Sequence, residues 1–275
     1  MKALFRVLAL APLPLLHGLG ALVGWITFLA SPTYRRRFLA NAAQAGYAFA
    51  DVRGGVAQAG RLALETPRLW FGPPVHAKWT DVHVVEAAQA RGKGVVFLTP
   101  HLGCFEIAAQ SYARQFARVT VLYRPARKAW LRDLVDSARA RENLATAPAT
   151  LAGVRQMLRA LKAGEAVGLL PDQVPPAGMG EWAPFFGRDA YTMTLSARLA
   201  QQTGATIVLV WAERLSWGRG YVVHVRPWDG PLDRDPARAA SQVNERMEAL
   251  VRECPSQYLW GYARYKEPRA DAAFS

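Results

Sequence analysis

His101 and Glu106 are the residues whose types and spacing most suggest catalysis. They belong to the segment TPHLGCFE at residues 99–106, which directly follows a β-branched run at residues 94–99. The pattern predicts that His101 lies in the turn between a strand and a helix, and that Glu106 lies in the first turn of that helix. Residues five apart on a regular helix diverge by about 140°, so a histidine in the preceding turn is the placement that lets the two side chains meet.

Such a pair has the groups that general-base catalysis needs. Glu106 can accept a hydrogen bond from one imidazole nitrogen, fix the tautomer and stabilise the cation that forms when the other nitrogen takes a proton. The base can then deprotonate an alcohol for attack on a thioester carbonyl, with backbone N–H groups at the helix start facing the developing oxyanion. Spacing alone also fits a structural pair, in which the histidine caps the helix and the glutamate is favoured by the helix dipole.

The elements that must position this pair alternate along the chain. Strand-like runs occupy residues 94–99, 118–123, 166–170, 206–212 and 221–226, and helical patterns fall at about 104–115, 128–141, 150–163, 192–203 and 236–253. This alternation predicts an α/β fold with a mostly parallel central sheet flanked by helices. In such sheets ligands bind at the carboxyl ends of the strands, where His101 follows one run and Asp172 follows another.

An apolar segment precedes these elements. Residues 7–34 contain no Asp, Glu, Lys or Arg, and three consecutive arginines follow at 35–37. This length exceeds the roughly 20 residues that span a bilayer core, so we expect residues 1–34 to be a membrane anchor and residues 35–275 to be the catalytic domain. Pro12, Pro14 and His17 leave two modes open, a helix that spans the membrane and a helix that lies in its surface. Residues 35–65 have the pattern of an amphipathic helix.

The net charge of the chain indicates the kind of partner that it binds. With 34 Lys and Arg against 21 Asp and Glu, the chain has a formal net charge of +13, which suits nucleic acid, anionic lipid headgroups or an acidic carrier protein. Part of the excess also fits arginines on solvated faces. The two cysteines, Cys104 and Cys254, are far apart in the sequence, so they indicate neither a disulfide framework nor a metal site.

Further motifs accompany the His101–Glu106 segment in order. They are Tyr123-Arg124-Pro125, Arg139 with Arg141, Gly164–Val167 followed by Asp172-Gln173, Phe185-Phe186-Gly187, Thr203-Gly204-Ala205, and a closing set of Pro255, Tyr258, Trp260, Arg264 and Lys266. Together with TPHLGCFE, this series resembles the bacterial lipid A biosynthesis acyltransferases, the late lauroyl and myristoyl transferases, from about residue 8 to residue 267. The joint occurrence of the motifs is more specific than any one of them.

The resemblance implies a glycerolipid-acyltransferase-like fold and an O-acyltransferase in which His101 is the general base and Glu106 assists it. It also implies substrate contacts for five side chains: Arg124, Arg139, Arg141, Asp172 and Gln173. The guanidinium fork suits phosphate, although arginines on amphipathic helices are often solvated, and Asp172 also fits an Asx turn. The family usually has Asn-Trp where this chain has Cys104-Phe105, and two adjacent arginines where it has Ala263-Arg264. These departures leave His101 and Glu106 in place and bear on the identity of the acceptor.

On this resemblance, the expected reaction moves a fatty acyl chain from an acyl carrier protein thioester, as co-substrate, to a hydroxyl of a lipid A precursor glycolipid. It needs no cofactor, no metal and no nucleic acid, and it takes place at the bacterial inner membrane with the catalytic domain facing the cytoplasm. Two alternatives stay open. One is the same chemistry with acyl-CoA as donor or with another glycolipid or an aminolipid as acceptor, and the other is a basic membrane-tethered binding protein without chemistry.

Overall fold

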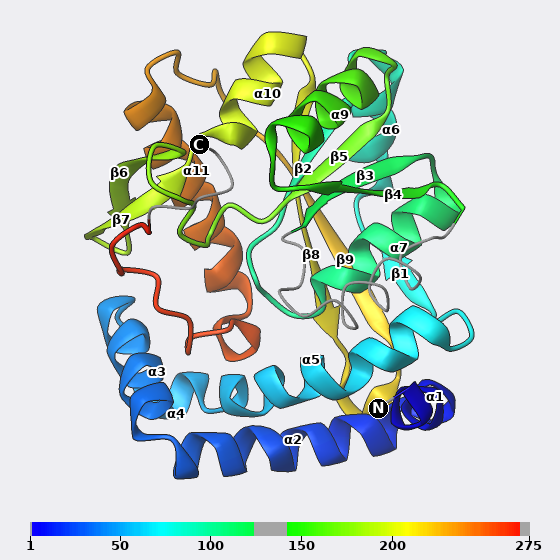
Figure 1. Cartoon of the computed structure of the whole chain (residues 1–275), viewed down its shortest axis with the longest axis vertical. Coiled ribbons are helices and arrows are strands. Elements are labelled where there is room, and N and C mark those ends of the chain that lie inside the picture. The colour runs from blue at the N-terminus through cyan, green and yellow to red at the C-terminus, as the bar shows by residue number, and fades with distance from the viewer. Residues whose placement is uncertain (1, 124–141, 270–275) are drawn as a thin grey trace.

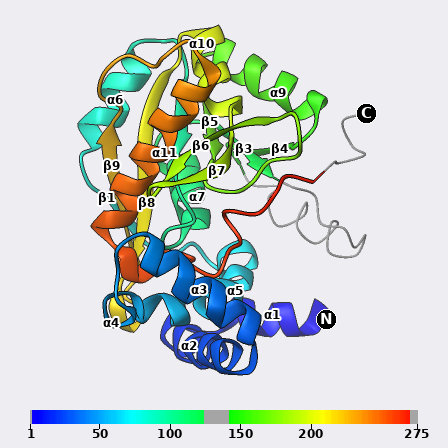
Figure 2. The same cartoon turned by 90° about the vertical axis from the view of Figure 1, so that its left-hand side faces the viewer.

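The computed structural model describes residues 2–123 and 142–269, which form an α/β core with a layer of N-terminal helices at one end (Figures 1 and 2). The central sheet consists of β1 (Ala77–Trp79), β2 (Val95–Leu98), β3 (Val119–Tyr123), β4 (Leu144–Pro148), β5 (Ala166–Leu169), β8 (Thr206–Arg214) and β9 (Tyr221–Pro227). Their order is β1-β9-β8-β2-β5-β3-β4, and each neighbouring pair is parallel except β8 with β9. The predicted fold class, a mostly parallel sheet flanked by helices, is confirmed.

Helices cover both faces of this sheet. On one face lie α6 (Val82–Ala90) and α7 (Phe105–Gln115), and on the other lie α9 (Leu151–Lys162), α10 (Leu195–Thr203) and α11 (Pro236–Glu253). Alternate residues of β2 divide between the two: Val95 and Phe97 pack with the first group, Val96 and Leu98 with the second. Both faces of this parallel strand are buried, so its sequence is a continuous apolar run. Such a run is visible in the sequence, and β2 was predicted from it.

A separate hairpin lies beside the sheet. It is formed by β6 (Gly180–Phe185) and β7 (Arg188–Met193), which pair antiparallel. Both turn residues, Phe186 and Gly187, have positive φ values, 48° and 74°, as a two-residue hairpin turn of the right twist requires. The backbone N–H of Phe186 donates to Glu248 at 2.7 Å and its carbonyl accepts from Gln44 at 2.7 Å. The sequence did not predict this hairpin, β1 or β4, and the helix expected at 128–141 lies outside the described residues.

The N-terminal layer contains α1 (Lys2–Leu10), α2 (Leu13–Ala30), α3 (Pro32–Gln44), α4 (Phe49–Val52) and α5 (Gly54–Phe71). The helical pattern expected at 35–65 is found, and it is divided among α3, α4 and α5. The chain turns after α3 at Gly46, whose φ of 84° is a left-handed conformation that glycine adopts without strain.

Helices α2 and α5 lie side by side in close antiparallel contact (Figure 1). A Cβ on Gly60 would overlap the carbonyl oxygen of Gly20, and a Cβ on Gly24 would overlap the carbonyl oxygen of Val56. Glycines four apart on one helix let two backbones approach in this way. By length and composition α2 is one helix that could cross a membrane, yet a third of it is buried inside the protein. The apolar segment therefore packs along α5.

Candidate active site

The sheet register brings His101 and Asp172 together. Strands β2 and β5 are parallel neighbours, and Leu98 at the end of β2 is paired with Leu169 at the end of β5. Each of the two polar residues lies three positions beyond this pair. His101 Nδ1 is 2.7 Å from Asp172 Oδ1, and the backbone N–H of His101 donates to Asp172 Oδ2 at 2.8 Å. The carboxyl edge of the sheet therefore carries a histidine–carboxylate pair.

The turn that holds His101 is fixed by backbone contacts with distant segments. Gly103 has a φ of 59°, and a Cβ there would overlap the carbonyl oxygen of Ala212 in β8, so no other residue fits without a shift. Its N–H donates to the carbonyl of Gln257 at 3.1 Å, and the N–H of Leu259 donates to the carbonyl of His101 at 3.1 Å. The C-terminal segment thus holds the turn in place against the sheet.

Asp172 is almost completely buried and is ionised. It is 1% exposed and accepts, in addition to its two bonds from His101, a hydrogen bond from the hydroxyl of Tyr258 at 3.2 Å. Burial by itself raises the pKa of Asp172, but the charge and hydrogen bonds of His101 and the charge of buried Arg264 outweigh burial and lower the pKa below its usual value. Burial, together with the neighbouring carboxylate, raises the pKa of Tyr258 well above normal, so its hydroxyl keeps its proton and donates.

These contacts select one tautomer of His101. An ionised carboxylate only accepts hydrogen bonds, so Nδ1 carries the hydrogen that bonds to Asp172. The side-chain amide nitrogen of Gln173 lies 2.9 Å from the other ring nitrogen, Nε2, and as a donor it faces the lone pair of that nitrogen. With Nδ1 bound to Asp172, Nε2 is the ring nitrogen that is placed to exchange a proton with a substrate, as a general base requires.

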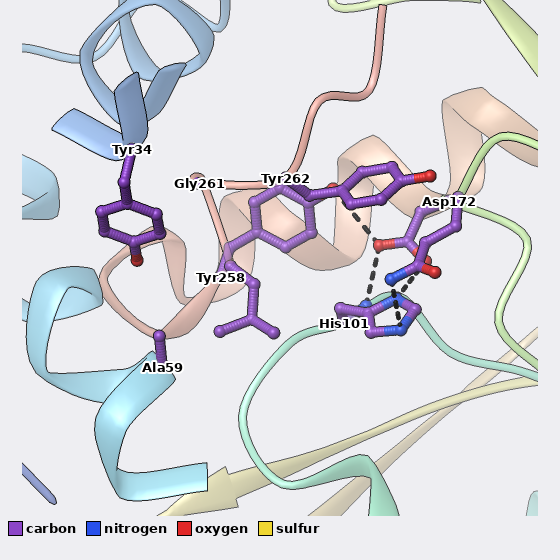
Figure 3. Close-up of a pocket in the computed structure, with 9 residues that line it drawn as sticks. Tyr34, Ala59, His101, Asp172, Tyr258, Gly261 and Tyr262 are labelled. Carbon is purple, nitrogen blue, oxygen red and sulfur yellow. Dashed lines mark hydrogen bonds and ion pairs between the residues drawn. The ribbon is translucent and has the colours of Figure 1, made fainter. Parts of the chain in front are cut away.

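A cavity of about 240 Å³ extends from His101 toward the N-terminal helices. Figure 3 shows Tyr34 of α3 and Ala59 of α5 at the end of the cavity opposite His101, with Tyr258 and Gly261 from the C-terminal segment between them. Its walls are mainly tyrosine rings and small or aliphatic residues. His101 therefore borders a space that suits an apolar group.

Glu106 lies in the first turn of α7, as expected, and its Oε2 accepts a hydrogen bond from the indole of Trp70 in α5 at 3.2 Å. The carboxylate in contact with the imidazole is that of Asp172, because both ring nitrogens of His101 are engaged by Asp172 and Gln173. The contribution of Glu106 to catalysis stays a prediction.

Two other expectations concern the substrate-binding arginines and metal binding. The three arginines proposed for substrate contacts, Arg124, Arg139 and Arg141, lie outside the described residues. For metals, within residues 2–123 and 142–269 no three His, Cys, Asp or Glu side chains are grouped as a metal site would need.

A buried ionic cluster contacts the turn that carries His101. Arg214 at the end of β8 donates to Glu65 of α5, with Nε 2.9 Å from Oε2, to the side chain of Gln58, and to the carbonyl of Gly103 at 3.1 Å. His17 of α2 reaches the same carboxylate at 2.8 Å. Burial raises the pKa of Glu65, but Arg214 and then His17 outweigh it and lower the pKa to about 2. The cluster links α2, α5 and the turn that carries His101.

Sequence reasoning missed some of these residues and undervalued others. Tyr258 and Arg264 were noticed only as parts of the closing motif. In the structure the hydroxyl of Tyr258 donates to Asp172, and the charge of Arg264 lowers the pKa of Asp172. No pattern singled out Glu65 and Arg214, because a buried pair separated by 149 positions leaves no local signal.

The fold is a mostly parallel α/β sheet with a histidine–aspartate pair at its strand ends, beside an apolar cavity. Comparison with known proteins identifies the class. The family model for the bacterial lipid A biosynthesis acyltransferase matches residues 2–267, so the chain belongs to this family. It is an O-acyltransferase of lipid A biosynthesis.

Individual relatives agree with this assignment. The lipid A biosynthesis lauroyltransferase of Escherichia coli (strain K12) is 30% identical over 210 residues, which cover 74% of this chain and 67% of the relative. The palmitoleoyltransferase of the same strain is 28% identical, covering 75% and 68%, and the myristoyltransferase is 24% identical, covering 77% and 65%. Because these relatives are named for different acyl chains, similarity at this level does not select the chain that is transferred.

Proposed function

We propose that this protein moves a fatty acyl chain from an acyl carrier protein thioester to a hydroxyl of a lipid A precursor, with His101 as the general base. One observation carries the proposal: His101 lines the apolar cavity, with Nδ1 2.7 Å from buried Asp172 and Nε2 2.9 Å from the side-chain amide nitrogen of Gln173. The names of the relatives support lipid A as the acceptor.

In the proposed reaction Nε2 of His101 takes the proton of the acceptor hydroxyl as its oxygen attacks the thioester carbonyl carbon. The C–S bond of the tetrahedral intermediate then breaks, and the imidazolium returns its proton to the leaving sulfur, so a free thiol and an ester are formed. Backbone N–H groups at the start of α7 are suited to stabilise the oxyanion. No cofactor or metal takes part, and the thioester is a co-substrate.

The neighbours of His101 receive separate roles. We assign Asp172 to orienting the ring and stabilising the imidazolium, a role that its three hydrogen bonds and its burial support. An incoming hydroxyl takes the place of the Gln173 amide as donor to Nε2, which leaves that amide free to bind substrate. Glu106 assists from the first turn of α7, where a negative charge is favoured by the helix dipole.

The cavity is proposed to hold part of the acyl chain. A water molecule in the liquid occupies roughly 30 Å³, so a volume of about 240 Å³ accommodates about eight groups of that size. That is room for the methylenes nearest the reacting carbonyl. The remainder of the chain then passes along the N-terminal helices, where Tyr34 and Ala59 line the far end of the cavity.

Charge and location complete the proposal. The net charge of +13 suits an acidic carrier protein and a phosphorylated acceptor, and Arg124, Arg139 and Arg141 are proposed to bind phosphate groups. The protein is proposed to act at the bacterial inner membrane with its catalytic residues on the cytoplasmic side, where carrier thioesters are available. No role for nucleic acid is included.

The direct test is acyl transfer by the purified full-length chain to an underacylated lipid A precursor, followed by mass spectrometry. His101→Ala should lower the rate by about 10²-fold or more, as expected for loss of a general base. His83→Ala, at an exposed position on α6, is the matched control and should leave the rate unchanged. Activity of the His101 variant equal to that of the control would refute the proposed mechanism.

Comparison of donors separates this proposal from its nearest alternative. The rate with acyl carrier protein should exceed the rate with acyl-CoA, because the acidic carrier is attracted to the basic protein. This advantage should shrink as salt is added. A preference for acyl-CoA at every salt concentration would support the alternative donor, and transfer only to another glycolipid or an aminolipid would support the alternative acceptor.

A further inference from the structure

We propose that α2 lies in the plane of an anionic phospholipid bilayer, without spanning it, and that the tip of the β8–β9 hairpin, carrying Trp217, inserts beside it as a second membrane anchor. The two segments are some 200 positions apart in the sequence. Neither segment is assigned this geometry by family membership, and the proposal does not depend on the reaction at His101.

Helix α2 is apolar on two faces. Its inner face, which includes Leu16, Gly20 and Phe28, is buried against the protein. Its outer face carries large apolar side chains in a regular stripe, at Leu15, Leu19, Leu22, Ile26 and Leu29, which are 44–65% exposed. Spacings of three and four place these side chains on one side of a helix. A continuous exposed stripe of this kind marks an interaction surface.

The inner contacts argue against a span. A transmembrane α2 would have to leave α5 or draw it into the bilayer, and α5 supplies Arg61 and Glu65 next to α2. Glu65 is fully buried and bonds both to His17 of α2 and to Arg214 of the sheet. Moving such groups into hydrocarbon, or separating them, is costly. An in-plane helix keeps every one of these contacts and still places its outer stripe in lipid.

The β8–β9 hairpin extends this surface. Trp217 is 85% exposed, more than any other large apolar side chain in the described part of the chain, and it lies in the short turn helix η1 (Ser216–Gly218). A Cβ on Gly218 would overlap the backbone of Pro14, so the hairpin tip touches the beginning of α2. Both views of the structure place the β8–β9 tip at the α2 end of the molecule (Figures 1 and 2). An indole at this position is suited to the headgroup region.

Charge selects an anionic bilayer as the occupant. The first 50 residues include five Lys or Arg and no Asp or Glu, and Arg36, Arg37 and Arg219 are exposed near the two ends of α2. Cations that flank an apolar surface bind anionic headgroups. A second copy of the same chain would instead place like charges against one another.

Vesicle flotation tests the surface with the purified full-length chain. The chain should float with vesicles of equimolar phosphatidylglycerol and phosphatidylethanolamine, and much less with phosphatidylcholine. Trp217→Ala should weaken partitioning by about tenfold or more, because the apolar area that enters lipid is lost. Trp182→Ala, at a partly exposed position on the β6–β7 hairpin, is the matched control and should bind as the unmodified chain does. Replacing Arg36 and Arg37 with glutamine should cost about fivefold for each arginine at low salt.

Labelling of introduced cysteines, with the unmodified chain and its Cys104 and Cys254 as the background control, tests the orientation of α2. Ala11→Cys and Thr33→Cys place a thiol just before and just after this helix, and a membrane-impermeant maleimide is applied to sealed membrane vesicles of both orientations. An in-plane helix predicts that both positions react in the same vesicle orientation, whereas reaction in opposite orientations would overturn the proposal.

In the flotation experiment, equal binding by the Trp217 and Trp182 variants would overturn the hairpin anchor. A stable dimer that fails to bind vesicles and dissociates on Trp217→Ala would show that a second copy occupies the surface. None of these results depends on acyl transfer.

Discussion

Asp172→Asn tests whether the buried carboxylate sets the tautomer of His101. The substitution keeps the shape of the side chain but turns one acceptor oxygen into an NH2 donor. If the NH2 group takes the place of Oδ1, it faces Nδ1 of the ring, which then gives up its hydrogen. Nε2 becomes protonated and cannot act as a base. If the NH2 group takes the place of Oδ2, it faces the backbone N–H of His101, and a buried donor is left without an acceptor.

The expected magnitude follows from these two arrangements. An unpaired buried donor costs about 1–3 kcal/mol, so the arrangement that inactivates the base competes strongly with the one that keeps it. Loss of the charge also removes the group that stabilises the imidazolium. Together these effects predict a fall in kcat of about 10²- to 10⁴-fold. KM should change little, because Asp172 is 1% exposed and contacts His101 and Tyr258.

The assay is steady-state transfer measured as kcat and KM, with thermal unfolding measured on the same preparations. Asp189→Asn, at an exposed position of β7, provides the same chemical change away from the site and should behave as the unmodified protein. An Asp172 variant that is folded and retains the unmodified kcat would refute the tautomer argument. A rise in KM with kcat unchanged would instead place Asp172 in substrate binding.

Three further predictions follow from other contacts. Glu65 has a pKa of about 2 in the folded protein against 4.5 unperturbed, so it contributes about 3 kcal/mol of stability that is present above pH 4.5 and is lost as the pH falls toward 2. Glu65→Gln should flatten this dependence of stability on acid pH. It should also lower the Tm at neutral pH by about 6–20 °C, because Arg214 loses its counter-charge. A Tm equal to that of the unmodified protein would contradict this prediction. Gly103→Ala should reduce both kcat and Tm, because alanine fits neither the positive φ nor the space, and unchanged kinetics would show that the turn tolerates a side chain. Gln173→Glu places an acceptor against Nε2 and stabilises the imidazolium of His101, so activity should fall at neutral pH and recover as the pH rises; a pH profile like that of the unmodified enzyme would argue against this contact.

The sequence predicted the sheet well where strands are buried on both faces. β2, β5 and β8 are apolar runs because helices cover them on either side. By contrast, β1 has only three residues, and β6 includes Gly180 and Pro184 and is exposed at half of its positions. Such strands owe their structure to neighbouring segments more than to their own composition, so a local pattern cannot reveal them.

The site was predictable in part for a similar reason. Placing His101 and Asp172 at strand ends followed from the alternation of elements, but their contact required β2 and β5 to be neighbours, which is a property of the strand order. The pairing of His101 with Glu106 rested on their spacing, on the predicted strand-to-helix turn and on the family resemblance, and it stays a prediction. Tyr34 and Tyr258 meet the same cavity from opposite ends of the sequence, and only the folded chain brings them together.

The central claim is that His101 acts as the base for transfer of an acyl chain to lipid A. Mass spectrometry of lipid A tests it most directly, in cells that carry the unmodified protein, the His101→Ala variant, or neither, with membrane levels of the protein matched. We predict that lipid A from cells with the unmodified protein contains one more acyl chain, and that the variant gives the same lipid A as cells without the protein. Lipid A that retains the additional chain in cells with the His101→Ala variant would contradict this assignment.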